Sequence, residues 1–260
     1  MSRWSADLAL AQQLADAADA ITMARFAAAD LVVETKPDLT PVSDADRAVE
    51  DEMRQTLAAA RPDDAVVGEE RGATGTSTRR WIIDPIDGTK GFVRGAPSWA
   101  TLIALDVDGE VVVGVVSAPA LSRRWWAARG DGSWARSPSG TRPCLVSQVT
   151  SLDDGFLSYA SLTGWETHGL LPQFLDLTRR VWRTRAYGDF WSHMLVAEGV
   201  VDISCEPEVS LWDLAALQPI VEEAGGRFSD LTGRARPDGG SVLCSNGRLH
   251  DEVLGLLSPP

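Results

Sequence analysis

Residues 81–95, WIIDPIDGTKGFVRG, constrain the fold and the chemistry of this chain more than any other segment. The apolar run at its start predicts a buried strand, and the acidic, glycine-containing sequence that follows predicts a sharp turn. Asp84 and Asp87 therefore stand at the end of a strand. Because Pro85 favours extended backbone at Asp84, we expect the two carboxylates to converge around the turn, with the Ile86 carbonyl between them.

Gly88 and Thr89 follow this corner and are predicted to open a short helix. Free backbone N–H groups and the positive end of the helix dipole can hold an anion there. Two carboxylates would repel a phosphate unless hard cations lay between them, so the corner predicts a magnesium-dependent phosphoryl site. The same residues also suit a plain surface turn, since Asp-Pro and Asp-Gly are common turn formers. Taken alone, they leave both interpretations open.

Composition excludes several classes of protein. The 260 residues can bury a large core, in one domain or two closely packed subdomains. A formal net charge of −13 argues against partners such as nucleic acid or anionic membranes. The three cysteines are far apart and the three histidines form no H-E-x-x-H motif, so neither a disulfide framework nor a zinc site is indicated. The charged N-terminal segment lacks a signal-peptide core, and we expect a cytoplasmic protein.

Hydrophobic periodicity predicts an α/β fold built in layers. The first half is predicted to contain an antiparallel meander, with helices at 5–28 and 44–60 and strands at 31–36, 65–67, 81–83, 99–106, 111–117 and 123–128. The second half alternates, with strands at 156–160, 182–186, 201–205 and 242–245 and helices at 166–178, 190–199, 211–224 and 249–257. Pro219 should kink the third of these helices. Residues 137–143, rich in Ser, Gly and Pro, predict a boundary between subdomains 1–140 and 141–260.

Three further acidic residues stand at the ends of predicted elements. Asp44 begins a helix, where a first-turn acid is favoured by the helix dipole, but it can also pair with a hydroxyl at a reaction centre. Glu69 follows a short strand, as Asp84 does. Asp213 fits a capping box that begins at Ser210, and it can equally face a metal shared between the subdomains. Each of these residues has a structural and a functional interpretation.

Together these segments resemble the inositol monophosphatase superfamily of Mg²⁺-dependent, lithium-sensitive phosphatases. The resemblance rests on GEE (68–70), DPIDGT (84–89) and WDLAA (212–216), with LTPVSDADRAVE before them and EAGG after them. It spans nearly the whole chain. It implies an αβαβα sandwich of two closely packed subdomains, with the N-terminal one supplying most metal ligands, and it suggests a homodimer.

The resemblance also implies a role for each motif residue. Two or three Mg²⁺ ions are expected, one held by Glu69, Asp84 and the Ile86 carbonyl, a second by Asp84, Asp87 and Asp213, and a weaker third by Glu69. Thr89 and Asp44 would help activate the attacking water, and Glu69 could also accept its proton. The amides of Gly88 and Thr89 would hold phosphate. Direct hydrolysis without a phosphoenzyme is expected.

Substrate choice is expected to depend on Asp189 and Glu206. The segments 89–103 and 186–203 resemble the histidinol-phosphate phosphatase branch of the superfamily. Histidinol phosphate carries an ammonium and an imidazole, which the carboxylates of Asp189 and Glu206 could bind. The expected reaction is hydrolysis of L-histidinol phosphate. The alternative is an inositol-1-phosphate phosphatase or a broad phosphomonoesterase, and a third hypothesis is a metal-binding regulatory protein without catalytic activity. Asp189 also suits a helix N-cap, and Arg94 is either an entrance residue or a solvated charge.

Overall fold

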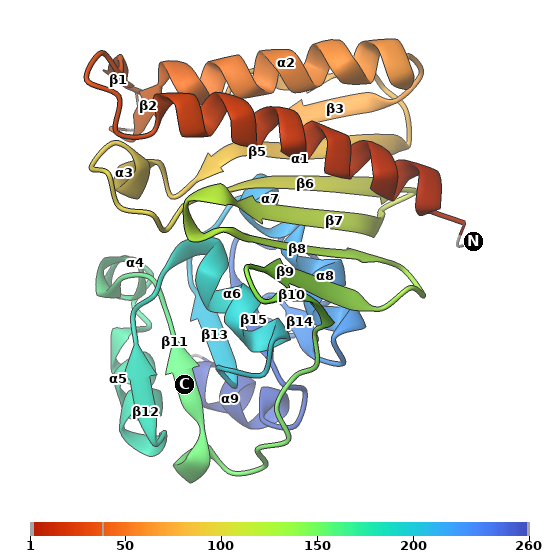
Figure 1. Ribbon diagram of the computed structural model, residues 1–260. Helices are drawn as coiled ribbons and strands as arrows, with labels where there is room; N and C mark the ends of the chain where they lie inside the picture. The colour runs from red at the N-terminus through yellow and green to blue at the C-terminus, as the bar shows by residue number, and fades with distance from the viewer. Residues whose placement is uncertain (1–2, 38, 259–260) are drawn as a thin grey trace.

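A computed structural model describes residues 3–37 and 39–258 of the chain (Figure 1). The outer ends of both predicted subdomains, and Asp38 in the turn before the second helix, lie outside the described residues. Within the described part, no helix is long and apolar enough to cross a membrane.

The first half of the chain builds a long sheet covered by two helices. In the described residues this sheet has eight strands in the order β10-β9-β8-β7-β6-β5-β3-β4. Neighbours are antiparallel except β3 and β5, which are parallel, so the predicted meander is confirmed. The strands are β3 (Ala65–Gly68), β4 (Gly72–Thr74), β5 (Arg79–Asp87), β6 (Ala100–Val107), β7 (Glu110–Ala118), β8 (Arg123–Ala128), β9 (Ser133–Ser137) and β10 (Gly140–Pro143).

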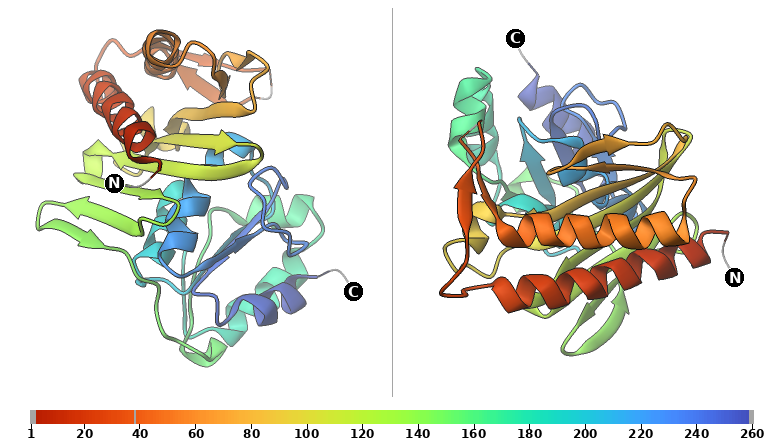
Figure 2. Two further views of the ribbon diagram at one scale, coloured as in Figure 1. Left: turned by 90° about the vertical axis from the view of Figure 1, so that its right-hand side faces the viewer. Right: turned by 90° about the horizontal axis from the view of Figure 1, so that it is seen from above.

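The central strands β5, β6 and β7 are buried on both faces, which explains why they read as continuous apolar runs. Trp81 and Ile83 pack with the apolar faces of α1 (Ser5–Arg25) and α2 (Asp44–Ala60), which lie side by side (Figure 2). Ile82, between them in sequence, points to the opposite face and joins a core that includes α6 and α8. Helices therefore cover both faces of β5, and its Asp84 end lies between the α1–α2 layer and the layer of α6 and α8.

A second sheet lies beyond the middle helices. Among the described residues it has the order β12-β11-β13-β15-β14 and mixes parallel and antiparallel pairs. Its strands are β11 (Phe156–Ser158), β12 (Arg183–Arg185), β13 (Ile203–Glu206), β14 (Arg227–Ser229) and β15 (Val242–Ser245). The helices α6 (Asp189–Ala197), α7 (Leu211–Leu214) and α8 (Leu217–Glu223) lie between the sheets, and α4 (Leu162–Thr167), α5 (Leu171–Arg180) and α9 (His250–Leu257) cover the outer face (Figure 1). The predicted αβαβα architecture is confirmed.

Several predicted boundaries differ from the structure. Residues 137–143 do not form a linker: β9 and β10 pair as a hairpin there, and the chain leaves the first sheet after Pro143. The predicted helix at 166–178 is two helices, because Gly169 adopts a positive φ of 68° between them. The helix predicted at 211–224 is interrupted after Leu214, upstream of Pro219. The division at residue 140 stays a prediction.

Short elements connect the longer helices and strands. A hairpin of β1 (Val33–Thr35) and β2 (Pro41–Ser43) precedes α2, and α3 (Thr89–Phe92) follows β5. Two 3₁₀ turns, η1 (Pro119–Leu121) and η2 (Leu152–Asp154), lie in connections. The ends of β3 and β5 therefore meet the hairpin on one side and the starts of α6 and α7 on the other.

Candidate active site

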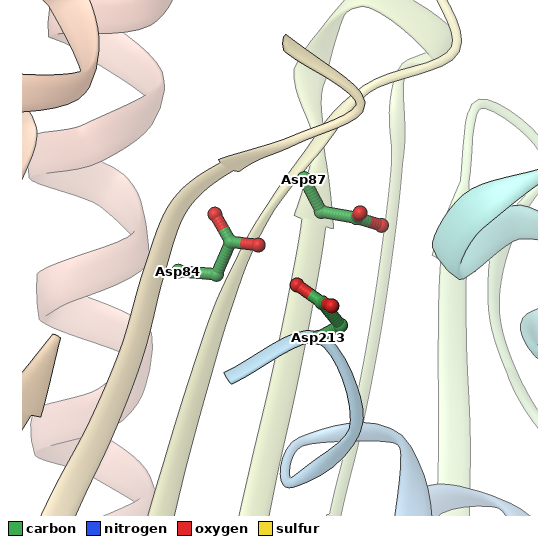
Figure 3. Close-up of side chains that lie close together, drawn as sticks. All are labelled: Asp84, Asp87 and Asp213. Carbon is green, nitrogen blue, oxygen red and sulfur yellow. The ribbon is translucent and has the colours of Figure 1, made fainter. Parts of the chain in front are cut away.

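Three aspartates from two separate parts of the sequence converge at the end of β5. Carboxylate oxygens of Asp84, Asp87 and Asp213 lie within 4.8 Å of one another, and Figure 3 shows the three side chains close together. Asp84 is 1% exposed. The predicted convergence of Asp84 and Asp87 around the turn is confirmed, so the surface-turn interpretation of this segment is wrong.

Hydrogen bonds within the corner hold its backbone. The register between β5 and β6 shifts between Asp84 and Asp87, which bends the strand. The Ile86 N–H donates to Oδ1 of Asp84 at 2.9 Å, and the Thr101 hydroxyl donates to the Pro85 carbonyl at 2.8 Å. These contacts orient the Asp84 side chain before any ligand binds.

Asp213 completes its predicted capping box and also lies in the aspartate cluster. The Ser210 N–H donates to Oδ2 of Asp213 at 2.7 Å and completes the predicted capping box at the start of α7. The same carboxylate belongs to the aspartate cluster. The cap therefore fixes the rotamer of a cluster member.

The electrostatics of the cluster favour a bound cation. Burial, followed by the charges of Glu69, Asp87 and Asp213, raises the pKa of Asp84 well above its usual value. Burial and neighbouring carboxylates likewise raise the pKa of Asp87 well above its usual value, and that of Asp213 to about 6. Crowded buried carboxylates are costly when all are ionised. A hard divalent cation relieves that repulsion and prefers oxygen donors, so the donor set fits Mg²⁺.

Glu69 lies near the cluster but is held by a residue that the sequence did not single out. The Lys36 ammonium, on the β1–β2 hairpin, lies 2.7 Å from Oε1 of Glu69 and also binds Glu70. Burial lowers the pKa of Lys36, but the two glutamates outweigh it and the net pKa is raised. Lys36 is therefore a fixed cation beside the acidic cluster.

Gly88 and Thr89 form the predicted corner before a single-turn helix. Gly88 has a φ of 89°, and a Cβ atom there would lie 2.8 Å from the Ser98 carbonyl oxygen, so glycine is required. The Thr89 hydroxyl donates to the Ile86 carbonyl at 2.9 Å. It also lies 3.4 Å from Oδ1 of Asp46.

The structure does not bring Asp44, which was expected to help activate the attacking water, to Thr89. Asp44 is the first residue of α2, and its Oδ2 accepts a hydrogen bond from Arg25 at 2.8 Å. Asp46, two residues later, is fully buried, accepts hydrogen bonds from the Ser43 N–H and hydroxyl, and approaches Thr89. Burial raises the pKa of Asp46. The Ser43-x-x-Asp46 spacing, a capping box, is the sequence signal that could have identified this residue.

Asp189 and Glu206 border a cavity of about 160 Å³ that adjoins the aspartate cluster. Asp189 is not the N-cap of α6; that position belongs to Gly188, and the Phe190 N–H instead donates to Oδ2 of Asp87 at 2.7 Å. The cavity lining includes five carboxylates and no lysine or arginine: Asp87, Asp189, Glu206, Glu208 and Asp213, with Phe190, His193, Val209 and Leu214. Arg94 is an exposed residue after α3 and is absent from this lining.

Comparison with known proteins agrees with this geometry. The sequence profile of the Inositol monophosphatase family matches residues 4–258. This chain belongs to that family. A histidinol-phosphatase of Streptomyces coelicolor is 60% identical, with 97% of each chain covered, and a histidinol-phosphatase of Mycobacterium tuberculosis is 61% identical, with 97% of this chain and 98% of that protein covered. The structure of an inositol monophosphatase from Zymomonas mobilis superposes with a TM-score of 0.86 at 32% identity, covering 99% of both chains.

Proposed function

We propose that this member of the inositol monophosphatase family hydrolyses L-histidinol phosphate to L-histidinol and phosphate. Two relatives that carry the name histidinol-phosphatase match it at 60% and 61% identity over 97% of its length. The observation that carries the substrate assignment is the cavity beside the aspartate cluster, which is lined by carboxylates and by no lysine or arginine. A cationic alcohol suits that lining better than a neutral polyol does.

Two or three Mg²⁺ ions are proposed to bind at the cluster. Asp84, Asp87 and Asp213 would supply carboxylate oxygens, with Glu69 and the Ile86 carbonyl as further ligands; in the structure these two accept hydrogen bonds from Lys36 and Thr89. When bound, magnesium lowers the pKa of water and neutralises charge on the attacking and leaving oxygens. The hard oxygen donors and the raised pKa values of the aspartates support this proposal.

The chain's own residues have three tasks in this proposal. The backbone amides at Gly88 and Thr89 would hold the phosphate. Gly88, with a positive φ and no side chain, supports this role because no Cβ atom blocks the approach to the backbone. Thr89 would orient the attacking water, and Asp46 would accept a proton through the Thr89 hydroxyl, replacing Asp44 in that role. Glu69 would remain a second acceptor, held by Lys36.

Inositol-1-phosphate is the alternative substrate, favoured by the similarity to the Zymomonas mobilis inositol monophosphatase. The metal-binding regulator is disfavoured because every predicted carboxylate ligand is present. A homodimer in the cytoplasm is the proposed state of the enzyme, as the family resemblance suggests.

Phosphate release in Mg²⁺ tests the function. We expect the wild-type chain to hydrolyse histidinol phosphate with a kcat/KM well above that for inositol-1-phosphate. Asp84→Asn should lose more than about 100-fold of this activity, since even residues outside the direct ligand shell of a metal contribute 10 to 100-fold. Preference for inositol-1-phosphate would overturn the substrate assignment, and full activity of Asp84→Asn would overturn the metal assignment.

A further inference from the structure

His193 is a buried residue of the cavity that the mechanism above does not use. It lies one helical turn after Asp189 on α6, so both side chains are on the same side of the helix. His193 is 2% exposed, and its Nε2 lies 3.1 Å from Oε1 of Glu206, the last residue of β13. The pair therefore joins the middle helical layer to the second sheet at the wall of the cavity.

The hydrogen bond fixes which ring nitrogen of His193 faces Glu206. A carboxylate oxygen accepts hydrogen bonds, so Nε2 is the donor in this pair. Nδ1 is buried with no hydrogen-bond partner among the described residues. Burying an unpaired polar atom is unfavourable, which argues that the imidazole is placed for its contact with Glu206.

Asp189 lines the same cavity as this pair and lies beside Gly88, whose amide would hold the phosphate. It adopts a φ of 47°, uncommon for a residue with a side chain, and its Oδ2 would lie 3.3 Å from a Cβ atom at Gly88. Burial, followed by the charge of Glu206, raises the pKa of Asp189 to about 6. Two carboxylates thus line one cavity, and one of them, Asp189, lies beside the corner whose amides would hold the phosphate.

We propose that His193 is a positioning residue that holds Glu206 in the cavity that Asp189 also lines, so that the two carboxylates select phosphate esters with an ammonium group close to the ester oxygen. This inference rests on the proposed function and deepens it. Because Asp189 lies beside Gly88, a cation bound by this carboxylate would lie close to the phosphate. The preferred class is therefore the 2-aminoalkyl phosphates, in which the ammonium is on the carbon next to the ester-bearing carbon; histidinol phosphate is one of them.

Two small esters isolate this feature. Phosphoethanolamine has the 2-ammonium group and no imidazole, and 2-hydroxyethyl phosphate replaces that ammonium with a hydroxyl. We expect the wild-type chain, with Mg²⁺, to show a kcat/KM for phosphoethanolamine about tenfold or more above that for 2-hydroxyethyl phosphate. A factor of this size corresponds to the free energy of one hydrogen bond to a charged group. Equal values, or no hydrolysis of phosphoethanolamine, would overturn the inference.

Variants of His193 test the positioning role. His193→Phe keeps a buried ring but removes the donor, and we expect most of the preference for phosphoethanolamine to be lost, chiefly through KM. His193→Gln can place an amide N–H near the Nε2 position and should restore much of it. His168→Phe, which removes an exposed imidazole on the outer helical layer, is the matched control and should keep the wild-type preference. An unchanged preference in His193→Phe would contradict the proposal.

A double-mutant cycle separates positioning from a general structural effect. If His193 acts only through Glu206, then His193→Phe should change the preference little further in a Glu206→Gln background. Additive losses would overturn the positioning role. Hydrolysis of histidinol phosphate is measured in the same series. If the chain hydrolyses histidinol phosphate but does not prefer phosphoethanolamine over 2-hydroxyethyl phosphate, this inference is wrong and the proposed function stands. If it prefers phosphoethanolamine but does not hydrolyse histidinol phosphate, the proposed substrate is wrong and this inference stands.

Discussion

Asp44 and Asp46 show how two residues of one acidic segment acquire different environments. They are two positions apart in α2, so the helix turns their side chains by about 200° relative to each other. Asp44 meets Arg25, whereas Asp46 points inward to Ser43 and to Thr89. The side chain that faces the interior has the raised pKa suited to accepting a proton.

Substitution of each aspartate by asparagine should therefore give different results. Asp46→Asn is expected to lower kcat by about 100-fold or more, because a proton acceptor near the reaction contributes 10² to 10⁴-fold. Asp44→Asn, which removes a partly exposed ion pair, should change kcat by less than about threefold. The measurement is phosphate release at saturating substrate and Mg²⁺, with thermal unfolding as the control for folding. Equal losses in the two variants would contradict the assignment of Asp46.

At the scale of elements, α2 controls the turn that carries Glu69. Glu50, fully buried on α2, accepts hydrogen bonds from the Glu70 N–H at 2.7 Å, the Arg71 N–H at 3.1 Å and the Arg54 guanidinium at 2.8 Å. A Cβ atom at Gly68 would lie 2.1 Å from a Glu50 carboxylate oxygen, so glycine is needed at the end of β3. Helix and turn are therefore coupled through one carboxylate.

Glu50→Ala should destabilise the fold and loosen the Glu69 turn. Removal of one partner from a buried charge network costs about 3 to 5 kcal/mol, and the free energy of unfolding in urea should fall by that amount. Magnesium affinity should fall as well, since Glu69 would lose its fixed position. Glu52→Ala, at an exposed position of the same helix, is the control and should stay within about 0.5 kcal/mol of wild type. A neutral Glu50→Ala would refute this coupling.

At the scale of the whole molecule, the acidic centre links stability, pH and magnesium. The aspartates of the cluster join the first sheet to the middle helical layer, and their raised pKa values mean that the folded chain binds protons more tightly there than the unfolded chain does. Their contribution to stability is fully present below their unfolded pKa of about 4 and is lost as pH rises through the folded values, about 6 for Asp213. Magnesium opposes this loss because it binds the ionised form.

We therefore expect the gain in stability from Mg²⁺ to be larger at pH 7.5 than at pH 5. At a Mg²⁺ concentration about 100 times its dissociation constant, the free energy of unfolding at pH 7.5 should rise by about 2.7 kcal/mol. Without Mg²⁺, the wild-type chain should lose stability relative to Asp213→Asn as pH rises between these values. Thermal unfolding at both pH values, with and without Mg²⁺, measures both effects. An equal gain at pH 5 and pH 7.5 would show that protons do not compete at this site.

Much of the site could be predicted because its chemistry is local. Asp84, Asp87 and Gly88 belong to one turn, and backbone sterics at Pro85 and Gly88 determine how that turn is built. The capping box of Asp213 is equally local. Elements of the fold with strong periodicity were predicted for the same reason, whereas the β9–β10 hairpin was missed because its residues are mostly polar or exposed.

The sequence by itself determined the buried strands, the acidic corner and the class of ion that suits it, because these depend on residues next to one another. Only the tertiary structure decided which distant side chains complete the site. Asp46 reaches Thr89 across 43 residues, Lys36 reaches Glu69 across 33, and His193 reaches Glu206 from another layer. The reason is geometric: the direction of a side chain on a helix or hairpin becomes fixed only when that element packs against its neighbours.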